Sequence, residues 1–369
     1  MSEPLVSVVT IVKDLVKNDR VKWFKQAVDS VKKQTYRNIE HVIIDGASTD
    51  GTIELLDDLT RQRRITRYHT QPDTGIYDAM NKGIERAQGK YVAFLNSDDY
   101  YHNPDAVAAS VAALESAKAV FSFGTVLMRR VDAKDRDSAL PFYPFEAQFF
   151  FTMPFSHQSM FCRRDVLELE RFDTSFKLAG DIDLIIRLYM KGYDGVPVDK
   201  EIATYRMTGA SSSQTSRVYD EYLRVFKKNF SRYVALGDAE ILRMLHEHVL
   251  HESMFEHVLP KLRAVNQRQY NRIMQKALIN FDRPSLLKRK LKHFFQARLS
   301  GAAFERLRLA FRDYFDVDVP FEDTGYYLFN IIPLFHIKKS VDGSIFKVTW
   351  GHFNLYKRKN TWKPLTTSS

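Results

Sequence analysis

The 369-residue chain is poor in the features that mark several classes of protein. Its single cysteine, Cys162, excludes an internal disulfide framework and any zinc site built from several cysteines, which fits a reducing compartment. No segment approaches about 18 uninterrupted apolar residues, so no membrane-spanning helix is expected. Residues 1–14 lack the basic stretch and long apolar run of a secretory signal. We therefore expect a cytoplasmic protein.

Two phosphate-binding motifs rich in glycine are also missing. The chain has no GxxxxGK[ST], and no GxGxxG follows the first predicted strand, which weakens the hypotheses of an ATPase or a dehydrogenase. What the chain does contain is 44% hydrophobic and 27% charged residues, the composition of a folded globular protein. Its length suits a large domain with one or two smaller ones.

The positive charge is confined to one part of the chain. The net charge is +10, but residues 1–215 hold 28 Lys and Arg against 30 Asp and Glu, whereas residues 216–369 hold 27 against 15. The segment from Lys261 to Arg312 alone has 14 basic residues and two acids. The basic surface is therefore expected to be local, beside a nearly neutral first domain.

The first hundred residues alternate between strand and helix patterns. Leu5–Val12 and Asn38–Asp45 are apolar and β-branched, as buried parallel strands are. Between them runs a helical stripe of Val21, Phe24, Val28 and Val31. Further elements are expected as a helix from about Thr52, a strand over 65–69, a helix over 76–88 and a strand over 91–95. This β-α-β-α-β-α-β order predicts an α/β fold with a mostly parallel, doubly wound sheet.

Acidic side chains follow two of these strands at the point where each strand ends. Ligands bind beyond the carboxyl ends of strands in such sheets. Asp98 and Asp99, without a Cys/His cluster, suit a hard divalent cation such as Mg²⁺ or Mn²⁺, which would bridge the phosphates of a nucleoside diphosphate. Asp45, Ser48 and Asp50 suit hydrogen bonds to a base and ribose. The sequence therefore predicts a nucleotide site at this edge.

We divide the chain into three regions. Residues 1–215 form the predicted catalytic domain, residues 216–327 a helical basic region, and residues 328–369 a small tail that contains a β-hairpin. The hairpin signal is an Asp-Gly pair between two runs of strand-like residues.

Four segments together resemble the family 2 glycosyltransferases, especially bacterial enzymes of surface-polysaccharide assembly. They are VSVVTIVKD, HVIIDGASTDGT, QPDTGIYDAMNKGIERAQGKYVAFLNSDD and AGDIDLIIRLYMKGY, and the resemblance covers about residues 5–215. It implies the nucleotide-sugar-binding α/β fold of that family. It also implies inverting transfer of a sugar from a nucleoside-diphosphate sugar, with a UDP-sugar as first choice, to a glycan or a lipid-linked acceptor.

The resemblance also assigns roles to single residues. The family's metal-binding Asp-x-Asp falls on Asn96-Ser97-Asp98, which implies Asp98 as the ligand of Mn²⁺ or Mg²⁺, assisted by Asp99. Asn96 stands where many members have Asp, and its amide can bond ribose but brings no charge. Asn96 and Ser97 are expected at the donor, together with Thr10, Val12, Asp45 and Asp50 around the nucleoside and Asp78, Asn81 and Lys82 nearby.

The catalytic base is expected to be Asp181 or Asp183. Inverting transfer needs one carboxylate to take the proton of the acceptor hydroxyl. Residues i and i+2 of a helix point about 200° apart, so the two acids cannot share a site. The family's acidic motif, commonly Glu-Asp, aligns with Gly180-Asp181, which favours Asp181 and leaves Asp183 to structure. For His157 and Arg206, contacts with substrate and purely structural roles both stay open.

Two other classes of function compete with sugar transfer. The basic segment would suit a nucleic-acid-binding module, but it has no recognised motif, and we expect no nucleic-acid partner. Nucleotidyl transfer on a similar fold would favour a Gly-rich, basic loop after the first strand, which TIVKD is not. The segment SLLKRKLKHFFQARL, residues 285–299, has the pattern of an interfacial helix. It predicts peripheral attachment to the anionic inner face of the cytoplasmic membrane.

Overall fold

The computed structural model divides the chain into two compact units. One unit is formed by residues 1–248 and 253–270, and the other by residues 249–252 and 271–369. The residues that the structure describes are 3–131, 137–144, 146–207, 215–247, 249–276, 280–281, 322–328, 332–339, 346–350, 353–358 and 361–364.

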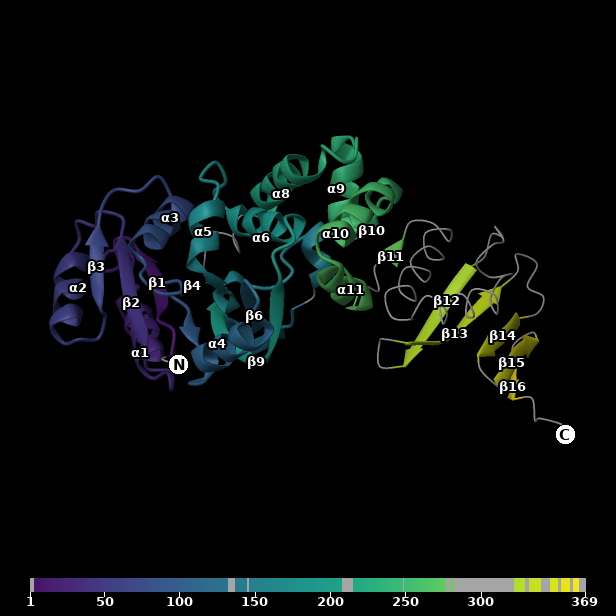
Figure 1. The fold of residues 1–369 in the computed structure, drawn as a ribbon, viewed down its shortest axis with the longest axis horizontal. Helices are drawn as coiled ribbons and strands as arrows, with labels where there is room; N and C mark the ends of the chain where they lie inside the picture. Colours follow the sequence, from purple (N-terminus) through teal and green to yellow (C-terminus); the bar gives the residue numbers. More distant parts are fainter. Residues whose placement is uncertain are drawn as a thin grey trace. The chain divides into compact units, whose positions relative to one another are not determined.

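A nine-stranded sheet forms the centre of the first unit (Figure 1). Its strands are β1 (Val6–Val12), β2 (Ile39–Asp45), β3 (Arg67–Thr70), β4 (Tyr91–Phe94), β5 (Tyr100–Tyr101), β6 (Phe121–Val131), β7 (Asp137–Phe142), β8 (Phe161–Arg163) and β9 (Gly195–Arg206). Their order is β3-β2-β1-β4-β8-β6-β9-β5, with β7 paired to β6. The strands β3, β2, β1 and β4 are parallel, whereas β8 is antiparallel to β4 and β6. The predicted α/β class is confirmed, and the reversed β8 makes the second half of the sheet mixed.

Helices cover both faces of the parallel part of the sheet. In this unit they include α1 (Val21–Lys32), α2 (Thr52–Arg61), α3 (Ile76–Arg86), α4 (Ala106–Ala117), α5 (Arg164–Glu170) and α6 (Gly180–Met190), with 3-10 turns at Glu146–Phe150 and His157–Ser159. Along β1, Val8 packs in one cluster with Ala27 and Val31 of α1. The next residue, Val9, points the other way. It faces Gly83 of α3 so closely that an added Cβ would lie 2.4 Å from it. The sheet is therefore doubly wound, as predicted.

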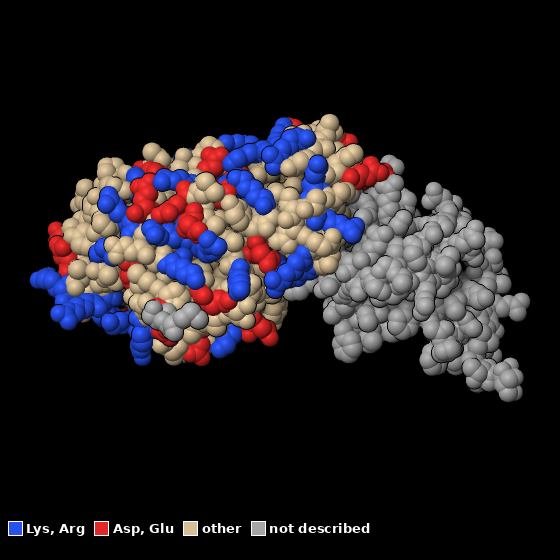
Figure 2. All heavy atoms as spheres, in the orientation of Figure 1, with Lys and Arg blue, Asp and Glu red and all other residues tan. Residues whose placement is uncertain are grey.

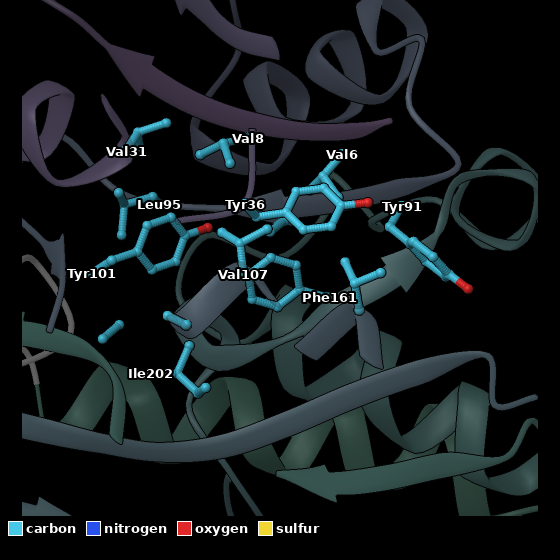
Figure 3. Packing of buried hydrophobic residues seen from close by; sticks show 14 of the residues in the cluster. Val6, Val8, Val31, Tyr36, Tyr91, Leu95, Tyr101, Val107, Phe161 and Ile202 are labelled. Carbon is cyan, nitrogen blue, oxygen red and sulfur yellow. The ribbon is translucent and has the colours of Figure 1, made fainter. Parts of the chain in front are cut away.

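A buried apolar cluster anchors the acidic loop that follows β4. It joins residues of β1, β4, α4 and β9, and Figure 3 shows Val8, Leu95, Tyr101 and Phe161 among its members. The rings of Tyr101 and Phe161 stack with centroids 6.0 Å apart. Leu95 and Tyr101 flank the polar residues 96–99, so both ends of this loop are fixed in the core. Such burial stabilises the fold by about 25 cal/mol per Å² of apolar surface.

A helical segment follows β9 within the first unit. It consists of α8 (Thr215–Phe230), α9 (Asp238–Glu247), a π-helical turn (Met254–Val258), α10 (Leu259–Val265) and α11 (Gln267–Lys276), whose last residues belong to the second unit. The helix α8 begins at Thr215, where the predicted catalytic domain ends, and lies in the same compact unit as the sheet. The three predicted domains stay a prediction.

Besides the end of α11, the described part of the second unit consists mainly of short strands. A two-stranded parallel pair joins β10 (Val249–Leu250) to β11 (Asn280–Phe281). Two antiparallel sheets follow, one of β12 (Glu322–Leu328) and β13 (Ile332–Lys339), the other of β14 (Phe346–Trp350), β15 (Phe353–Arg358) and β16 (Thr361–Pro364). The predicted interfacial helix over 285–299 lies outside the described residues.

Basic and acidic side chains are interspersed over the described face in Figure 2. This pattern fits the nearly balanced charge of the first 215 residues. Within the described ranges, no helix has both the length and the apolar character that crossing a membrane requires.

Candidate active site

The candidate site begins where the parallel strands end. Val12, the last residue of β1, pairs in register with Asp45, the last residue of β2. On the other side of β1, Val9 is in register with Phe94 of β4, and the N–H of Leu95 donates to the carbonyl oxygen of Val9 at 3.0 Å. The loops after β1, β2 and β4 therefore start from neighbouring points on one edge of the sheet, as predicted from parallel strands.

Asp99 is fully buried and held by donors from three parts of the chain. Its Oδ1 accepts the N–H of Arg206 at 2.9 Å. Its Oδ2 accepts Nδ2 of Asn96 at 3.1 Å and Nε2 of Gln158 at 2.9 Å. Burial, followed by the nearby charge of Asp98, raises the pKa of Asp99 to about 7. Asp99 thus joins the loop after β4 to β9 and to the turn that contains Gln158.

Asp98 lies at the rim of the same loop. Its carboxylate is 9% exposed, and Nη1 of Arg20 approaches Oδ2 at 3.8 Å. Its backbone carbonyl accepts a hydrogen bond from Arg206. Ser97 is buried beside it, and Asn96 is half-buried with its amide turned to Asp99. Of the two adjacent acids, Asp98 is the one that reaches toward solvent.

Arg206 braces this loop from the end of β9. Its guanidinium group also bonds Oε1 of Gln26 on α1. The group lies 5.6 Å from the ring centroid of Trp23 and 5.0 Å from that of Tyr100, distances of cation–π contacts. The guanidinium group is therefore engaged in contacts within the protein. These contacts support the structural role that the sequence left open for Arg206.

Asp181 lies in the first turn of α6 within a second polar cluster. Its Oδ2 is 2.9 Å from Nδ1 of His157, a contact that places the proton on Nδ1 because an ionised carboxylate only accepts. Its Oδ1 accepts the hydroxyl of Tyr77 at 3.1 Å and the N–H of Ile182 at 2.9 Å. Burial and the charge of Asp181 raise the pKa of Tyr77 well above its ordinary value, so Tyr77 stays a donor.

One short turn joins the two clusters. Gln158 bonds Asp99, and its neighbour His157 bonds Asp181. Nε2 of His157 is buried and has no hydrogen-bond partner among the described residues. The structure therefore brings Asp98 and Asp99, from the end of β4, to the same region as Asp181. From the sequence, a structural role and a substrate contact were both open for His157, and Gln158 was missed because an amide in an irregular loop carries no pattern.

Asp183 belongs to a different environment from Asp181. Its Oδ2 accepts Nε of Arg187 and Nζ of Lys228, each at 2.9 Å. Its Oδ1 accepts Nδ2 of Asn229, also at 2.9 Å. The carboxylate is fully buried and ties α6 to α8. This is the geometry of a structural residue.

The residues expected around the nucleoside are engaged in contacts within the chain. Thr10 is buried with its hydroxyl 3.0 Å from Nε2 of His41. Val12 packs in an apolar cluster between the sheet and α1 and α2. Asp45 accepts the hydroxyl of Ser48 and, at 3.0 Å, its N–H. The support for a ligand-binding role of this loop is its position at the end of β2.

Asp50 shapes the start of α2. Its Oδ1 accepts the N–H and the hydroxyl of Thr52 at 3.1 and 2.6 Å, and its Oδ2 accepts the N–H of Lys17 at 2.7 Å. Slight burial acts to raise the pKa of Asp50, but these hydrogen bonds outweigh it and lower the pKa. Asp50 therefore stays ionised and links the loops after β1 and β2.

The residues of α3 that are expected near the donor make two kinds of contact within the chain. Asp78 accepts the N–H of Thr74 and pairs with Nζ of Lys82, both at 2.9 Å. Burial acts to raise the pKa of Asp78, but these two contacts lower it. Asn81 forms a pair of 2.9 Å hydrogen bonds with the backbone N–H and carbonyl of Phe172. Asn81 thus fixes the chain that leads to α6.

The carboxylates of this edge fit a cation that is shared with a ligand. Within the described ranges, no three His, Cys, Asp or Glu side chains form a cluster that could hold a metal ion. Asp98 nevertheless offers a carboxylate near the surface, and Mg²⁺ or Mn²⁺ commonly binds one or two carboxylates, waters and substrate phosphates. Asp99 is less available because its oxygens already accept three hydrogen bonds.

The chain matches the model of glycosyl transferase family 2 over residues 15–169, which include the loop of Asp98 and Asp99. An uncharacterized glycosyltransferase of Mycobacterium tuberculosis is 35% identical over 190 residues, which cover 50% of this chain and 69% of the relative. A PGL/p-HBAD biosynthesis glycosyltransferase of Mycobacterium bovis is 30% identical over 172 residues, which cover 44% of this chain and 62% of that protein.

A solved structure shares the fold. It is the mannosyltransferase PcManGT from Pyrobaculum calidifontis in complex with GDP-Man and Mn²⁺, with a TM-score of 0.51 and 17% identity over 85% of this chain and 84% of that one. At this identity the likeness concerns the fold alone. From the family match and the mycobacterial relative, the chain belongs to glycosyl transferase family 2 and is a glycosyltransferase.

Proposed function

We propose that this glycosyltransferase transfers a sugar, with inversion, from a nucleoside-diphosphate sugar to a glycan or a lipid-linked acceptor in bacterial surface-polysaccharide synthesis. A UDP-sugar is the first donor to test. Family membership favours sugar transfer over nucleotidyl transfer or nucleic-acid binding. The name of the Mycobacterium bovis relative, a PGL/p-HBAD biosynthesis glycosyltransferase, supports a role in a biosynthetic pathway.

Asp181 is the catalytic base in this proposal. The carboxylate takes the proton of the acceptor hydroxyl while the hydroxyl oxygen bonds the anomeric carbon and the bond from that carbon to the diphosphate breaks. The single observation that carries the proposal is the turn at His157 and Gln158, which joins Asp181 to the acidic loop after β4. The hydrogen bonds from Tyr77 and His157 hold the carboxylate in a fixed orientation, which catalysis by a positioned group needs.

Asp98 holds the cation in this proposal, and Asp99 supports the loop from behind. A bound Mn²⁺ or Mg²⁺ would stabilise the negative charge of the departing diphosphate. Asn96 and Ser97, in the same loop, would meet the ribose. The remaining donor contacts are proposed for Thr10, Val12, Asp45 and Asp50 on the nucleoside side and for Asp78, Asn81 and Lys82 on the sugar side.

The test is the release of UDP or GDP from nucleotide sugars, compared with the release of pyrophosphate. A thermal-shift screen of nucleotide sugars, with and without Mn²⁺, would first identify the donor. Asp181→Asn should then keep donor binding and lose turnover by several orders of magnitude, whereas Asp183→Asn should do less harm to turnover. The reverse ranking would move the base to Asp183, and pyrophosphate release would point to nucleotidyl transfer.

We also propose attachment to an anionic membrane surface through residues 285–299, whose sequence pattern would place Leu286, Leu291 and Phe294 on one face of a helix, bordered by Lys and Arg. A lipid-linked acceptor would give this attachment a purpose. Liposomes rich in anionic lipid should co-sediment the full chain at low salt, and liposomes of neutral lipid should not. Equal recovery in both pellets, or none in either, would remove this part of the proposal.

A further inference from the structure

The helix α8 follows the sheet in the chain and lies against α6, the helix that carries Asp181. Several of its side chains reach α6 or the segment that precedes it, where Arg224 meets the carbonyl oxygen of Ser175. Lys228 and Asn229 bond Asp183 inside α6. Glu221, two turns earlier on α8, instead reaches the backbone just before α6 begins. Glu221 therefore holds the backbone that leads into Asp181.

The carboxylate of Glu221 accepts three consecutive backbone N–H groups. Oε1 accepts the N–H of Lys177 at 2.7 Å. Oε2 accepts the N–H groups of Leu178 and Ala179 at 2.7 and 2.8 Å. Glu221 is 8% exposed, so its charge is met by these donors rather than by water. Hydrogen bonds to an ionised acceptor are short and strong, which fixes the path of residues 177–179.

This contact differs from an ordinary helix cap, because it holds the backbone before the helix rather than the first turn. Helices usually begin at a Ser, Thr, Asp or Asn whose side chain accepts an N–H of the first turn. The residue before α6 is Ala179, which has no side-chain oxygen and makes no such bond. Glu221 instead holds the N–H of Ala179 from another helix, one residue upstream of Gly180 and two upstream of Asp181.

We infer that Glu221 is a positioning residue for the catalytic base: by holding residues 177–179 it sets the place and the direction of Asp181. The inference rests on the proposed role of Asp181. By this inference α8 helps to position the catalytic base, although α8 lies beyond the segment that the family model matches.

The chain offers a matched control in Glu170. Glu170 is also 8% exposed and also holds α6, but at the far end of the helix, where it bonds Arg187 and Lys191. Glu221→Gln and Glu170→Gln each replace a buried carboxylate by an amide of the same size. Both should lower the melting temperature. Only Glu221→Gln should disturb Asp181.

The experiment compares kcat, the donor KM and the melting temperature of the two variants in the full chain. We expect Glu221→Gln to lower kcat at least tenfold with the donor KM within about twofold of the parent, and Glu170→Gln to keep kcat within about twofold. Glu221→Asp, which keeps the charge on a shorter side chain, should recover part of kcat. If Glu221→Gln does not fold, Glu221→Asp against Glu170→Asp makes the same comparison.

Two results would overturn the inference. One is a parent-like kcat for Glu221→Gln, or for Glu221→Asp where only that variant folds. The other is an equal loss of kcat when Glu170 is changed in the same way, which would reduce the effect to the stability of α6. In the background of Asp181→Asn, Glu221→Gln should lower turnover little further, because both changes act on one group. A fully active Asp181→Asn would instead refute the proposed base itself.

Discussion

The ring of Tyr77 fills the space that a side chain on Gly180 would need. A Cβ built on Gly180 would lie 2.7 Å from Cδ2 of Tyr77, far inside van der Waals contact. The hydroxyl of the same tyrosine donates to Asp181. The residue before the proposed base is commonly Glu in the family pattern, whereas Gly180 here leaves room for the ring of Tyr77. The ring packs on the glycine and thereby brings its hydroxyl to the carboxylate.

Gly180→Ala should therefore damage both the fold and the reaction. The added methyl group must push the ring of Tyr77 aside, and overpacking of this kind costs about 1–3 kcal/mol. We expect a lower melting temperature and a kcat reduced roughly tenfold or more, measured as UDP or GDP release. Gly237→Ala is the matched control, since a Cβ there would meet only Oε2 of Glu240, at 3.6 Å. An unchanged kcat for Gly180→Ala would show that the pairing with Tyr77 does not matter for the reaction.

His157 should matter through the proton that it presents to Asp181. Asn has a side-chain N–H₂ group close to the position of Nδ1 of His, whereas Ala has no donor. We expect His157→Ala to lower kcat by about 10- to 100-fold and His157→Asn to retain more activity, because orientation of the base survives in part. Equal losses in both variants, at equal melting temperatures, would argue against the hydrogen bond and for another role of the ring.

The two adjacent acids after β4 should respond differently to the same change. Asp98→Asn should abolish transfer with little change in the melting temperature, because Asn has nearly the volume of Asp and this side chain lies closer to the surface than that of Asp99. Asp99→Asn should destabilise the fold by about 1–3 kcal/mol, since the amide keeps one acceptor oxygen and its N–H₂ group would face at least one of the three donors that now bond the carboxylate. Thermal unfolding and nucleotide release on both variants check this. Full activity of Asp98→Asn would exclude its role as the metal ligand.

The parallel half of the sheet could be predicted because its signal is local. The strands β1 and β2 and the helix α1 between them carry their own apolar patterns, and the elements from β1 to β4 occur close to the expected residues. The strand β8 could not be predicted in the same way. It has three residues, Phe161–Arg163, too few to show a period, and its direction depends on pairing with β4 across some 70 residues.

The candidate site was predictable only in part, for a similar reason. The angle between positions i and i+2 of a helix separated Asp181 from Asp183 without any knowledge of their neighbours. The groups that hold Asp181 and the backbone before it are distant in the chain. Tyr77 is 104 residues from Asp181, and Glu221 is 42 residues from Ala179, whose N–H it accepts. Asp45 illustrates the converse. Its polar type suggested a ligand, but short polar side chains often bond their own loop, as Asp45 does with Ser48.

His41 makes the stability of the fold depend on pH. It is fully buried in β2, and burial lowers its pKa from 6.5 to about 3. The folded state therefore keeps a neutral imidazole at pH values where the unfolded chain takes up a proton. The stability that depends on this neutral ring is fully present above pH 6.5 and is lost as the pH falls toward 3.

Urea unfolding at pH 7.5 and pH 5.0 tests this dependence. A depressed pKa costs up to about 1.4 kcal/mol per pH unit below the unfolded value, so the parent should lose on the order of 2 kcal/mol through His41 over this range. His41→Gln keeps a side chain that can bond the hydroxyl of Thr10, now 3.0 Å from Nε2, but it cannot take up a proton. The free energy of unfolding of this variant should therefore fall less between the two pH values. The same fall in both proteins would mean that acid acts on other groups, because His41 is the only ionisable side chain that differs between them.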